Sequence, residues 1–514
     1  MQTRKYITIL AMTSLVVSSC KKDFLELYPE GAINLTTFYK TDRDFQQAVV
    51  GAYVPLRDAA NAAFYLEEMR SDNTDYYYNA QDRGGTAYEQ IADFMDDKGN
   101  GVISTVWKAD YQGIQRCNVI LDRLETAKEV TDAVKTQAIG ETKALRAHYY
   151  FELVRLFGKL PLFLHEVKQQ SESQLGRSSV DSVYDQIISD LTDAISKLPV
   201  TTFSTTDVQT GRITKGMAAT ELGMVYVTRK EWQKASDILT TVTTMGYHLL
   251  PEYKTLFKVT TENSRESIFE VQYKSGTDGQ SSMFIYYFTP VVKSTTPYLG
   301  INYANTAGGW NTPTDDMLSQ YEPGDKRLDA SIGYVKGHYD TTGTYVADSV
   351  SSVLSPATPN EESRIFVRKY LDPPYYNALR NTDQNWPVYR YADVELLLAE
   401  ALNEQGKSGD ALPYLNDVRT RAGLVASTET DQALLREVIA HERRVELAFE
   451  NKRWFDLIRT GQAIPVMTAF GIKQKQKYSY IAPGAYNVNA NKLVYAIPNY
   501  EMTYNTALTQ NDGY

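Results

Sequence analysis

The sequence predicts a mostly α-helical protein built from tetratricopeptide-like helical hairpins, with a long insertion of irregular loops and short strands. Two observations lead to this prediction. Apolar residues recur with helical spacing before about residue 250 and after about residue 386. Between these regions Gly, Pro, Ser, Thr and Tyr are clustered, and the helical spacing is lost. A long irregular segment within a helical protein is usually either functional or disordered, and the tryptophans and many tyrosines of this one argue against disorder throughout.

The N-terminus has the pattern of a lipoprotein export signal. The positive pair Arg4–Lys5 precedes an apolar stretch at 7–17, which is as long as a signal-peptide core and too short to span a bilayer. Two serines then precede Cys20, in a pattern that resembles a bacterial lipobox. We therefore expect residues 1–19 to be a signal peptide and Cys20 to carry a lipid that anchors residues 20–514 at a membrane.

Four long helices are expected in the N-terminal helical part, residues 20–250. Their approximate bounds are 44–60, 107–124, 135–157 and 179–198. Two segments after residue 200 then fit the spacing of a tetratricopeptide repeat, in which small residues let two antiparallel helices pack closely. The six matching positions are Leu222, Gly223, Tyr226, Ala235, Leu239 and Val242 in the first segment, and Leu398, Ala399, Leu402, Ala411, Leu415 and Val418 in the second.

The irregular insertion is assigned to residues 251–385, and the C-terminal helical part with its tail to residues 386–514. The insertion contains short β-like runs such as SIFEVQY and many aromatic residues. The chain as a whole has 38 tyrosines but only 17 phenylalanines. Because tyrosine combines a flat apolar face with a polar tip, this bias suits the binding of flat, polar ligands.

Charge and motifs exclude several classes of function. The formal net charge of −10 argues against a nucleic-acid partner. The chain has no G-x-S-x-G motif, and its five histidines are scattered, so we expect neither a catalytic triad nor a metal site. We expect no cofactor either. Cys117, the second cysteine, is expected to be a small buried residue rather than a nucleophile. The charged residues of HERRVELAFENKRWFDLIRTG are expected to form ion pairs on a helix and its cap.

Six segments, in this order, resemble the SusD/RagB family of Bacteroidetes outer-membrane lipoproteins. They are ALRAHYYFELVRLFGKLPL, GRITKGMAATELGMVYV, VYRYADVELLLAEALNEQG, LNDVRTRAGL, ERRVELAFENKRWFDLIRTG and the terminal YAIPNYEMTYNTALTQNDGY. The family commonly ends in Asn-Pro-Gly-Tyr, whereas this chain has Asp512 in place of the proline.

The resemblance implies a protein that captures a nutrient at the cell surface without catalysis. The nutrient is usually an oligosaccharide. The family's partner is a SusC-like TonB-dependent transporter, over which the protein forms a lid. By this resemblance the chain is an outer-membrane protein facing the cell exterior, held there by the lipid on Cys20.

The stretch DNTDYYYNA contains the first candidate ligand contacts. Tyr76, Tyr77 and Tyr78 cannot all face one core, because adjacent side chains point in different directions in both strands and helices. We therefore expect at least one of these rings to be exposed, with Asn79 available to bind hydroxyl groups. By resemblance, this stretch lies where family members carry part of their glycan-binding arc.

Trp310, in AGGWNT, is the second candidate, because two preceding glycines allow the backbone to present a bulky ring in a loop. It matches a stacking tryptophan of starch-binding members of the family. We expect Trp310 to contribute to binding and little to stability. Tyr286 and Tyr298 in the same insertion are further ligand-binding candidates, with Tyr287 beside the first. Weaker candidates are Trp386, Tyr375 and Tyr376.

Two other classes of function remain open. A glycoside hydrolase needs two carboxyl groups, and ADFMDD offers Asp93, Asp96 and Asp97. A protein–protein scaffold would use the tetratricopeptide-like hairpins to bind peptides. The aromatic insertion favours the nutrient-binding class over the scaffold, because a scaffold has no need of exposed tyrosine and tryptophan rings. The hydrolase is disfavoured because acidic surface loops such as ADFMDD are common.

Overall fold

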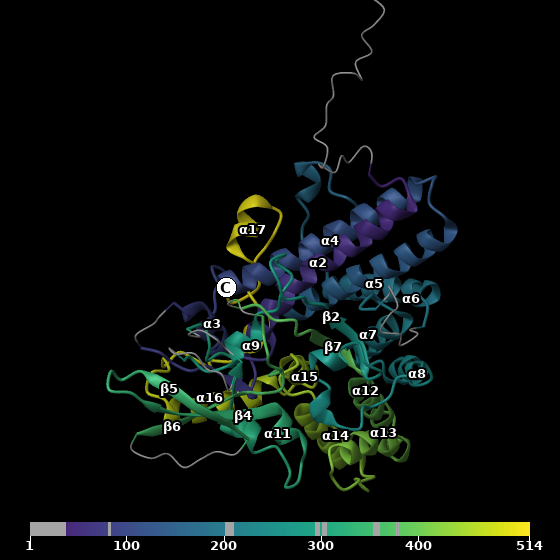
Figure 1. The fold of residues 1–514 in the computed structure, drawn as a ribbon. Coiled ribbons are helices and arrows are strands. Elements are labelled where there is room, and N and C mark those ends of the chain that lie inside the picture. Colours follow the sequence, from purple (N-terminus) through teal and green to yellow (C-terminus); the bar gives the residue numbers. More distant parts are fainter. Residues whose placement is uncertain are drawn as a thin grey trace, which may run out of the picture.

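The computed structural model describes residues 38–80, 84–200, 210–292, 299–300, 306–352, 360–376, 378 and 380–514. The expected signal peptide, the lipid attachment at Cys20 and the candidate Tyr298 therefore lie outside the described residues. Helices dominate the fold, as predicted, and form a layer of long helices beside a body of shorter helical hairpins (Figure 1). No helix within the described ranges has both the length and the apolar character needed to cross a membrane.

The α-helices are α2 (Asp42–Glu67), α3 (Thr86–Ala92), α4 (Gly101–Thr126), α5 (Asp132–Phe157), α6 (Val180–Lys197), α7 (Lys215–Thr228), α8 (Trp232–Thr243), α9 (Phe284–Phe288), α10 (Asp315–Leu318), α11 (Arg327–Ser331), α12 (Tyr391–Glu404), α13 (Ser408–Arg421), α14 (Gln432–Glu446), α15 (Arg453–Arg459), α16 (Ala463–Lys477) and α17 (Asn499–Tyr504). Short 3-10 turns cover Gln170–Ser173, Tyr253–Thr255, Val259–Thr261 and Ala490–Leu493.

The four long helices predicted in the N-terminal part are confirmed as α2, α4, α5 and α6, which pack on one another in turn (Figure 1). Polar caps set their starts: the side chain of Asn100, for example, accepts a hydrogen bond of 3.0 Å from the backbone N–H of Val102 at the start of α4. Helix α5 ends at Gly158, whose φ of +71° is readily adopted by glycine.

Both predicted hairpins are confirmed, as α7 with α8 and α12 with α13, and α12 packs against α8. Ala235 and Ala411 are fully buried at the helix crossings. At Gly223 an added Cβ atom would lie 2.4 Å from the side chain of Leu239. The small residues of the repeat pattern therefore allow the close approach of the paired helices.

The strands are β1 (Thr74–Asp75), β2 (Ser267–Val271), β3 (Thr312–Pro313), β4 (Ile332–Tyr339), β5 (Tyr345–Ser351), β6 (Glu361–Val367) and β7 (Trp386–Arg390). The predicted strand in SIFEVQY is confirmed as β2, which pairs antiparallel with β7 and so joins the insertion to the C-terminal helical part.

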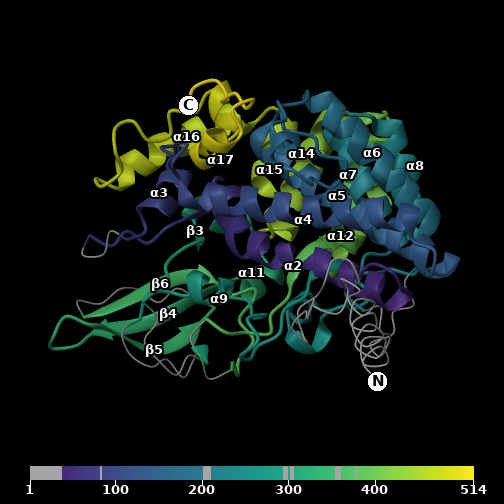
Figure 2. The ribbon, with the colours of Figure 1, turned by 90° about the horizontal axis from the view of Figure 1, so that it is seen from above.

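The insertion is more regular than the sequence suggested. Strands β5, β4 and β6 form an antiparallel sheet in that order, with Lys336 opposite Ser349 on one side and Ser363 on the other. The sheet lies to one side of the helices (Figure 2). The buried side chains of the sheet include β-branched and aromatic residues such as Val335 and Phe366. Residues of these types favour strands.

The expected ion pairs of the HERRVELAFENKRW segment are confirmed, but most of the partners lie on other elements. Arg443 of α14 pairs with Asp393 of α12 at 2.8 Å. Glu446 pairs with Arg390, at the end of β7, at 3.0 Å. These side chains are buried, so their pairing fixes how α14 sits against its neighbours.

Candidate functional site

Strands β1 and β3 bring the two main groups of candidate residues together. Thr74 lies opposite Pro313 in this short antiparallel pair. Just beyond it, the backbone N–H of Tyr77 donates a hydrogen bond of 2.7 Å to the carbonyl of Gly309. Gly309 has a φ of +88°, and an added Cβ would lie 2.9 Å from that of Tyr77. This glycine thus allows the turn that places Trp310 beside the tyrosine stretch.

Trp310 is half-buried rather than freely presented. Its ring rests on Gly85, where an added Cβ would lie only 2.3 Å from the indole. It also meets Tyr88 of α3 edge-on, with ring centroids 4.9 Å apart. The expectation that Trp310 contributes little to stability therefore does not fit its packing, although part of its ring remains accessible.

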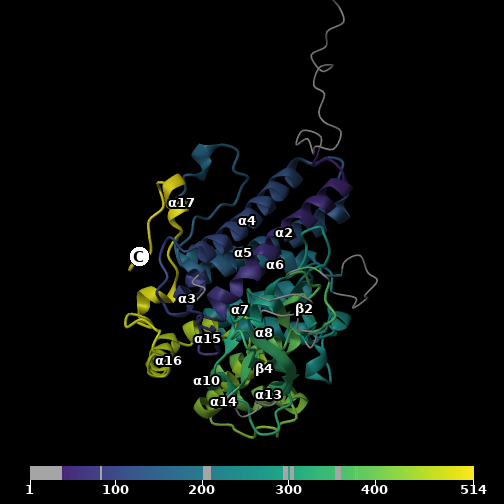
Figure 3. The same ribbon diagram turned by 60° about the vertical axis from the view of Figure 1, so that its left-hand side comes forward.

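Two stacks of tyrosine rings extend from Trp310. In the first stack, Tyr65 of α2 and Tyr88 lie face to face, with centroids 4.2 Å apart and planes inclined by 13°. In the second, Tyr78 and Tyr480 lie 4.1 Å apart at 5°, and Tyr480 continues to Tyr478 at 5.2 Å. The second stack exists because the segment after α16 lies beside α3 (Figure 2, Figure 3).

We call the half-buried rings of this array the aromatic platform. It consists of Tyr78, Tyr88, Tyr287, Trp310, Tyr478 and Tyr480. The buried ring of Tyr76 links its two stacks, because its centroid lies 6.2 Å from that of Trp310 and 6.1 Å from that of Tyr480. The platform is therefore one continuous array of rings.

The predicted site residues do not all lie on this platform. Tyr77 is the outward-facing ring of the tyrosine triplet, 40% exposed, and its ring lies 4.7 Å from the Arg364 guanidinium. Tyr78 and Asn79 are half-buried. Tyr76 is only 5% exposed and Tyr286 only 1%, so a role for either in stacking directly on a ligand does not fit its burial.

The weaker candidates also include both buried and exposed rings. Trp386 is 4% exposed and packs on Tyr370, whereas Tyr376 is exposed. Sequence reasoning missed Tyr88, Tyr478 and Tyr480. The only local signal for the last two is their spacing in YSY, which turns both side chains of an extended segment to the same side.

Two carboxyl groups, those of Asp75 and Asp93, lie near Tyr76, the buried ring that links the two stacks of the platform. The Tyr76 hydroxyl donates a hydrogen bond of 2.9 Å to Asp93. Burial, followed by the nearby charge of Asp93, raises the pKa of Asp75 to about 7. Burial also raises the pKa of Asp93 to about 6. These acids therefore hold their protons to higher pH than exposed carboxyl groups do.

The carboxyl groups considered for a hydrolase have other contacts. Asp96 is buried, pairs with Arg70 and accepts a hydrogen bond of 2.9 Å from the Tyr514 hydroxyl. Asp97 is exposed and accepts a hydrogen bond of 2.7 Å from the backbone N–H of Gly99. With the contact between Asp93 and Tyr76, all three carboxyl groups take part in local structure.

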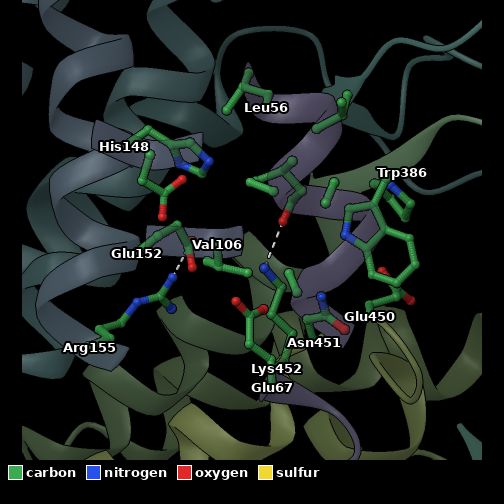
Figure 4. A pocket seen from close by; sticks show the side chains of 17 residues that line it. Leu56, Glu67, Val106, His148, Glu152, Arg155, Trp386, Glu450, Asn451 and Lys452 are labelled. Carbon is green, nitrogen blue, oxygen red and sulfur yellow. Dashed lines mark hydrogen bonds and ion pairs between the residues drawn. The ribbon is translucent and has the colours of Figure 1, made fainter. Parts of the chain in front are cut away.

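A polar cavity of about 60 Å³ lies among α2, α4, α5 and β7 (Figure 4). Glu67, Glu152 and Arg155 line it, and the last two form an ion pair. Burial raises the pKa of Glu67 well above its usual range. The volume is enough for a few water molecules, whereas pockets for organic ligands usually measure several hundred Å³. The aromatic platform is therefore a better candidate for ligand binding than this cavity.

Two further predictions concern thiols and metals. Cys117 is fully buried, and burial raises the pKa of its thiol to about 12, which confirms that it is a buried apolar residue rather than a nucleophile. Within the described ranges, no three His, Cys, Asp or Glu side chains come together in a way that could hold a metal ion.

A body of helical hairpins with stacked, half-exposed rings on its surface has the architecture of a protein suited to holding flat, polar ligands. Two family models match the chain in succession. One, described as "Starch-binding associating with outer membrane", matches residues 23–227, and the other, described as "SusD family", matches residues 265–514. The chain belongs to the SusD/RagB family.

Known relatives match nearly the whole chain. SusD-like protein P2 of Formosa agariphila is 28% identical, over 99% of this chain and all of the relative. A SusD superfamily crystal structure from Bacteroides vulgatus has a TM-score of 0.73 and 25% identity, over 93% of this chain and all of that one. The structure of a laminarin-binding SusD-like protein has a TM-score of 0.72, 25% identity and the same coverage.

Proposed function

We propose that this protein captures an oligosaccharide at the cell surface, without cleaving it, and delivers it to a SusC-like TonB-dependent transporter in the outer membrane. The observation that carries the proposal is the convergence of half-exposed rings from four separate parts of the chain on one platform. Such rings stack on the C–H faces of sugar rings, and their hydroxyl groups can bind sugar hydroxyls.

The rings of the platform pack on one another, which favours binding. Tyr88 is stacked on Tyr65, and Tyr78 on Tyr480, so their rings are already held by neighbours. Because little side-chain freedom is lost when a ligand arrives, more of the stacking energy contributes to affinity. The description of the N-terminal family match and the laminarin-binding relative support a glycan as the ligand.

Affinity electrophoresis in gels that contain single polysaccharides tests glycan capture. We expect at least one glycan to retard the protein, and Tyr88→Ala to weaken that retardation by about tenfold in apparent affinity, or ~1.4 kcal/mol. Tyr500→Ala is the matched control, because Tyr500 is an exposed tyrosine on α17 and not part of the platform. Equal effects of the two variants would contradict the assignment of the platform as the site.

The same glycan, incubated with the protein and analysed for reducing ends, tests the absence of catalysis. We expect depletion of the glycan on immobilised protein without any new reducing ends. Release of shortened products would favour the hydrolase alternative. For delivery, we expect a transporter of the SusC type to co-purify with the tagged, full-length protein from detergent-solubilised outer membranes of its host.

A further inference from the structure

Arg380 lies at the edge of the aromatic platform and has no ion-pair partner among the residues that the structure describes. The guanidinium carbon of Arg380 lies 5.6 Å from the ring centroid of Tyr287. Burial, followed by the neighbouring Tyr287, raises the pKa of Tyr88, and the Arg380 charge opposes this rise. The guanidinium is therefore within electrostatic reach of two platform residues.

Arg380 is half-buried, and its Nε–H group is fully buried without a hydrogen-bond partner. Across the described part of the chain, its guanidinium forms neither a hydrogen bond nor an ion pair. The Nε–H groups of Arg70, Arg123 and Arg421 are also buried without a partner, but each of these guanidinium groups forms an ion pair through another nitrogen. Arg146 likewise pairs with Asp190 and Arg443 with Asp393, each at 2.8 Å. A buried N–H group without an acceptor destabilises the structure, and it does so more when the group is charged.

Arg380 is one of nine described residues other than glycine with a positive φ. Its φ is +56°, in the left-handed region that side chains other than glycine rarely adopt. Strained conformations of this kind persist where the surrounding structure enforces them, and they are concentrated at ligand sites. Arg380 thus combines an unfavourable backbone conformation with an unpaired N–H group, and it lies next to the half-buried rings of the platform.

The chemistry of a guanidinium defines which ligand group would pair best with the N–H groups at the tip of Arg380. Its N–H groups form a planar fork that matches the two oxygens of a carboxylate or sulfate, and its charge is best balanced by an anion. A neutral hydroxyl could accept a hydrogen bond from the fork, but it would leave the charge uncompensated. The remainder of the ligand would stack on the adjacent rings.

We propose that Arg380 binds an acidic group on the glycan, a uronic acid carboxylate or a sulfate ester, while the neighbouring sugar rings stack on Tyr88, Tyr287 and Trp310. This inference rests on the proposed function and deepens it, because it assigns acidic rather than neutral glycans as the ligand class. The protein itself has a net charge of −10, so an acidic glycan is attracted at this point and not by the surface as a whole.

Calorimetric titration with matched ligands tests the inference. The probes are an oligogalacturonide and its carboxyl-reduced form, and a sulfated galactan oligosaccharide and its desulfated form. We expect the wild-type protein to bind one acidic probe at least about tenfold more tightly than the neutralised form of that probe, with an affinity that falls as salt is raised. Which pair shows the difference distinguishes carboxylate from sulfate.

Variants then assign the effect to Arg380. Arg380→Gln should remove the preference for the acidic probe and leave affinity for the neutralised form within about twofold. Arg380→Lys should retain part of the preference, because it keeps the charge and loses the fork. Arg436→Gln is the control, since Arg436 forms a surface pair with Glu404 and is not part of the platform.

Three outcomes would overturn the inference. The first is equal binding of an acidic probe and its neutralised form by the wild-type protein. The second is a preference that survives in Arg380→Gln. The third is binding of neutral glycans alone, which would leave the proposed capture of glycans intact. If no glycan binds at all, the proposed function itself fails, and this inference fails with it.

Discussion

Tyr78 and Tyr480 stack almost in parallel, with ring centroids 4.1 Å apart and planes inclined by 5°, although they come from opposite ends of the chain. This contact ties the loop after β1 to the segment after α16. It also means that the platform is formed only when the N-terminal and C-terminal parts are assembled. Ligand binding and the long-range packing of the chain are therefore linked at this pair.

A double-mutant cycle measures that link. Tyr78→Ala and Tyr480→Ala should each lower the free energy of unfolding, and their effects should fall short of additivity by about 0.5–1.5 kcal/mol, the usual coupling of a stacked pair. Urea denaturation of the two single variants and the double variant gives this value. Tyr78→Ala combined with Tyr500→Ala should be additive, and additivity in the Tyr78–Tyr480 cycle would contradict a stabilising stack.

The sequence was sufficient to predict the scaffold because the scaffold depends on local patterns. Helical spacing of apolar residues predicts α2, α4, α5 and α6, and the positions of small residues predict both hairpins. The sequence predicted that charged residues of α14 form ion pairs, but it did not predict which residues they pair with. Asp393, which pairs with Arg443, lies 50 positions away, and no local pattern relates the two residues.

The site was harder to predict because it is made by tertiary convergence. Tyr286 and Tyr287 are adjacent in sequence, yet only Tyr287 is accessible, because the other side of the short helix α9 faces the core. Nothing in the sequence relates Tyr88 to Tyr65, or Tyr480 to Tyr78. Arg380 is a single arginine in a loop, and no local pattern relates it to Tyr287, whose ring it contacts.

Gly223→Ala tests the packing of the first hairpin. Replacing glycine by alanine inside a helix normally stabilises it by about 0.5–1 kcal/mol. Here the new Cβ would meet Leu239 at 2.4 Å, so we expect a loss of ~1–3 kcal/mol and a lower melting temperature. Gly51→Ala in α2 is the matched control, because an added Cβ there has no atom within 4 Å. A stabilised Gly223→Ala variant would be incompatible with the observed crossing.

Cys20→Ala tests the proposed lipid anchor. Because the lipid would be attached through the thiol, the variant should remain unprocessed or leave the membrane fraction, as measured by fractionation and mass spectrometry of the N-terminus. Cys117→Ala is the matched control, since that thiol is buried in the core and should not affect fractionation. Membrane association of Cys20→Ala equal to that of wild type would refute the anchor.

The buried carboxyl group of Asp75 should make stability depend on pH. Its pKa in the folded protein is about 7, above the value of about 3.9 expected for an unfolded chain. Between these values the folded state keeps a proton that the unfolded state loses, so the stability from this group falls as pH rises from about 4 to 7 and then levels off.

Asp75→Asn should remove this dependence and still accept the hydrogen bond from the backbone N–H of Tyr76. We expect the variant to gain on the order of 1–4 kcal/mol relative to wild type between pH 4 and pH 8, measured by urea denaturation. Asp278→Asn, at an exposed position, serves as the control. Parallel pH profiles for wild type and Asp75→Asn would contradict the raised pKa.

Gly85→Ala tests the packing of the Trp310 ring against Gly85 without altering any aromatic residue. Gly85 has a φ of −92°, which alanine adopts without strain, so the effect comes from the new Cβ, which would lie 2.3 Å from the rigid indole. The ring must shift to make room. We therefore expect affinity for the captured glycan to fall by about tenfold, together with a stability loss of ~1–3 kcal/mol.

Titration calorimetry beside thermal melts separates the two effects, and Gly101→Ala at the start of α4 is the control, because its added Cβ would have no atom within 4 Å. Trp310→Ala should lose both affinity and stability, since the half-buried ring contributes to packing as well as to the platform. If Gly85→Ala loses stability but binds the glycan normally per folded molecule, Trp310 is a packing residue alone. In that case the platform begins at Tyr78 and Tyr480.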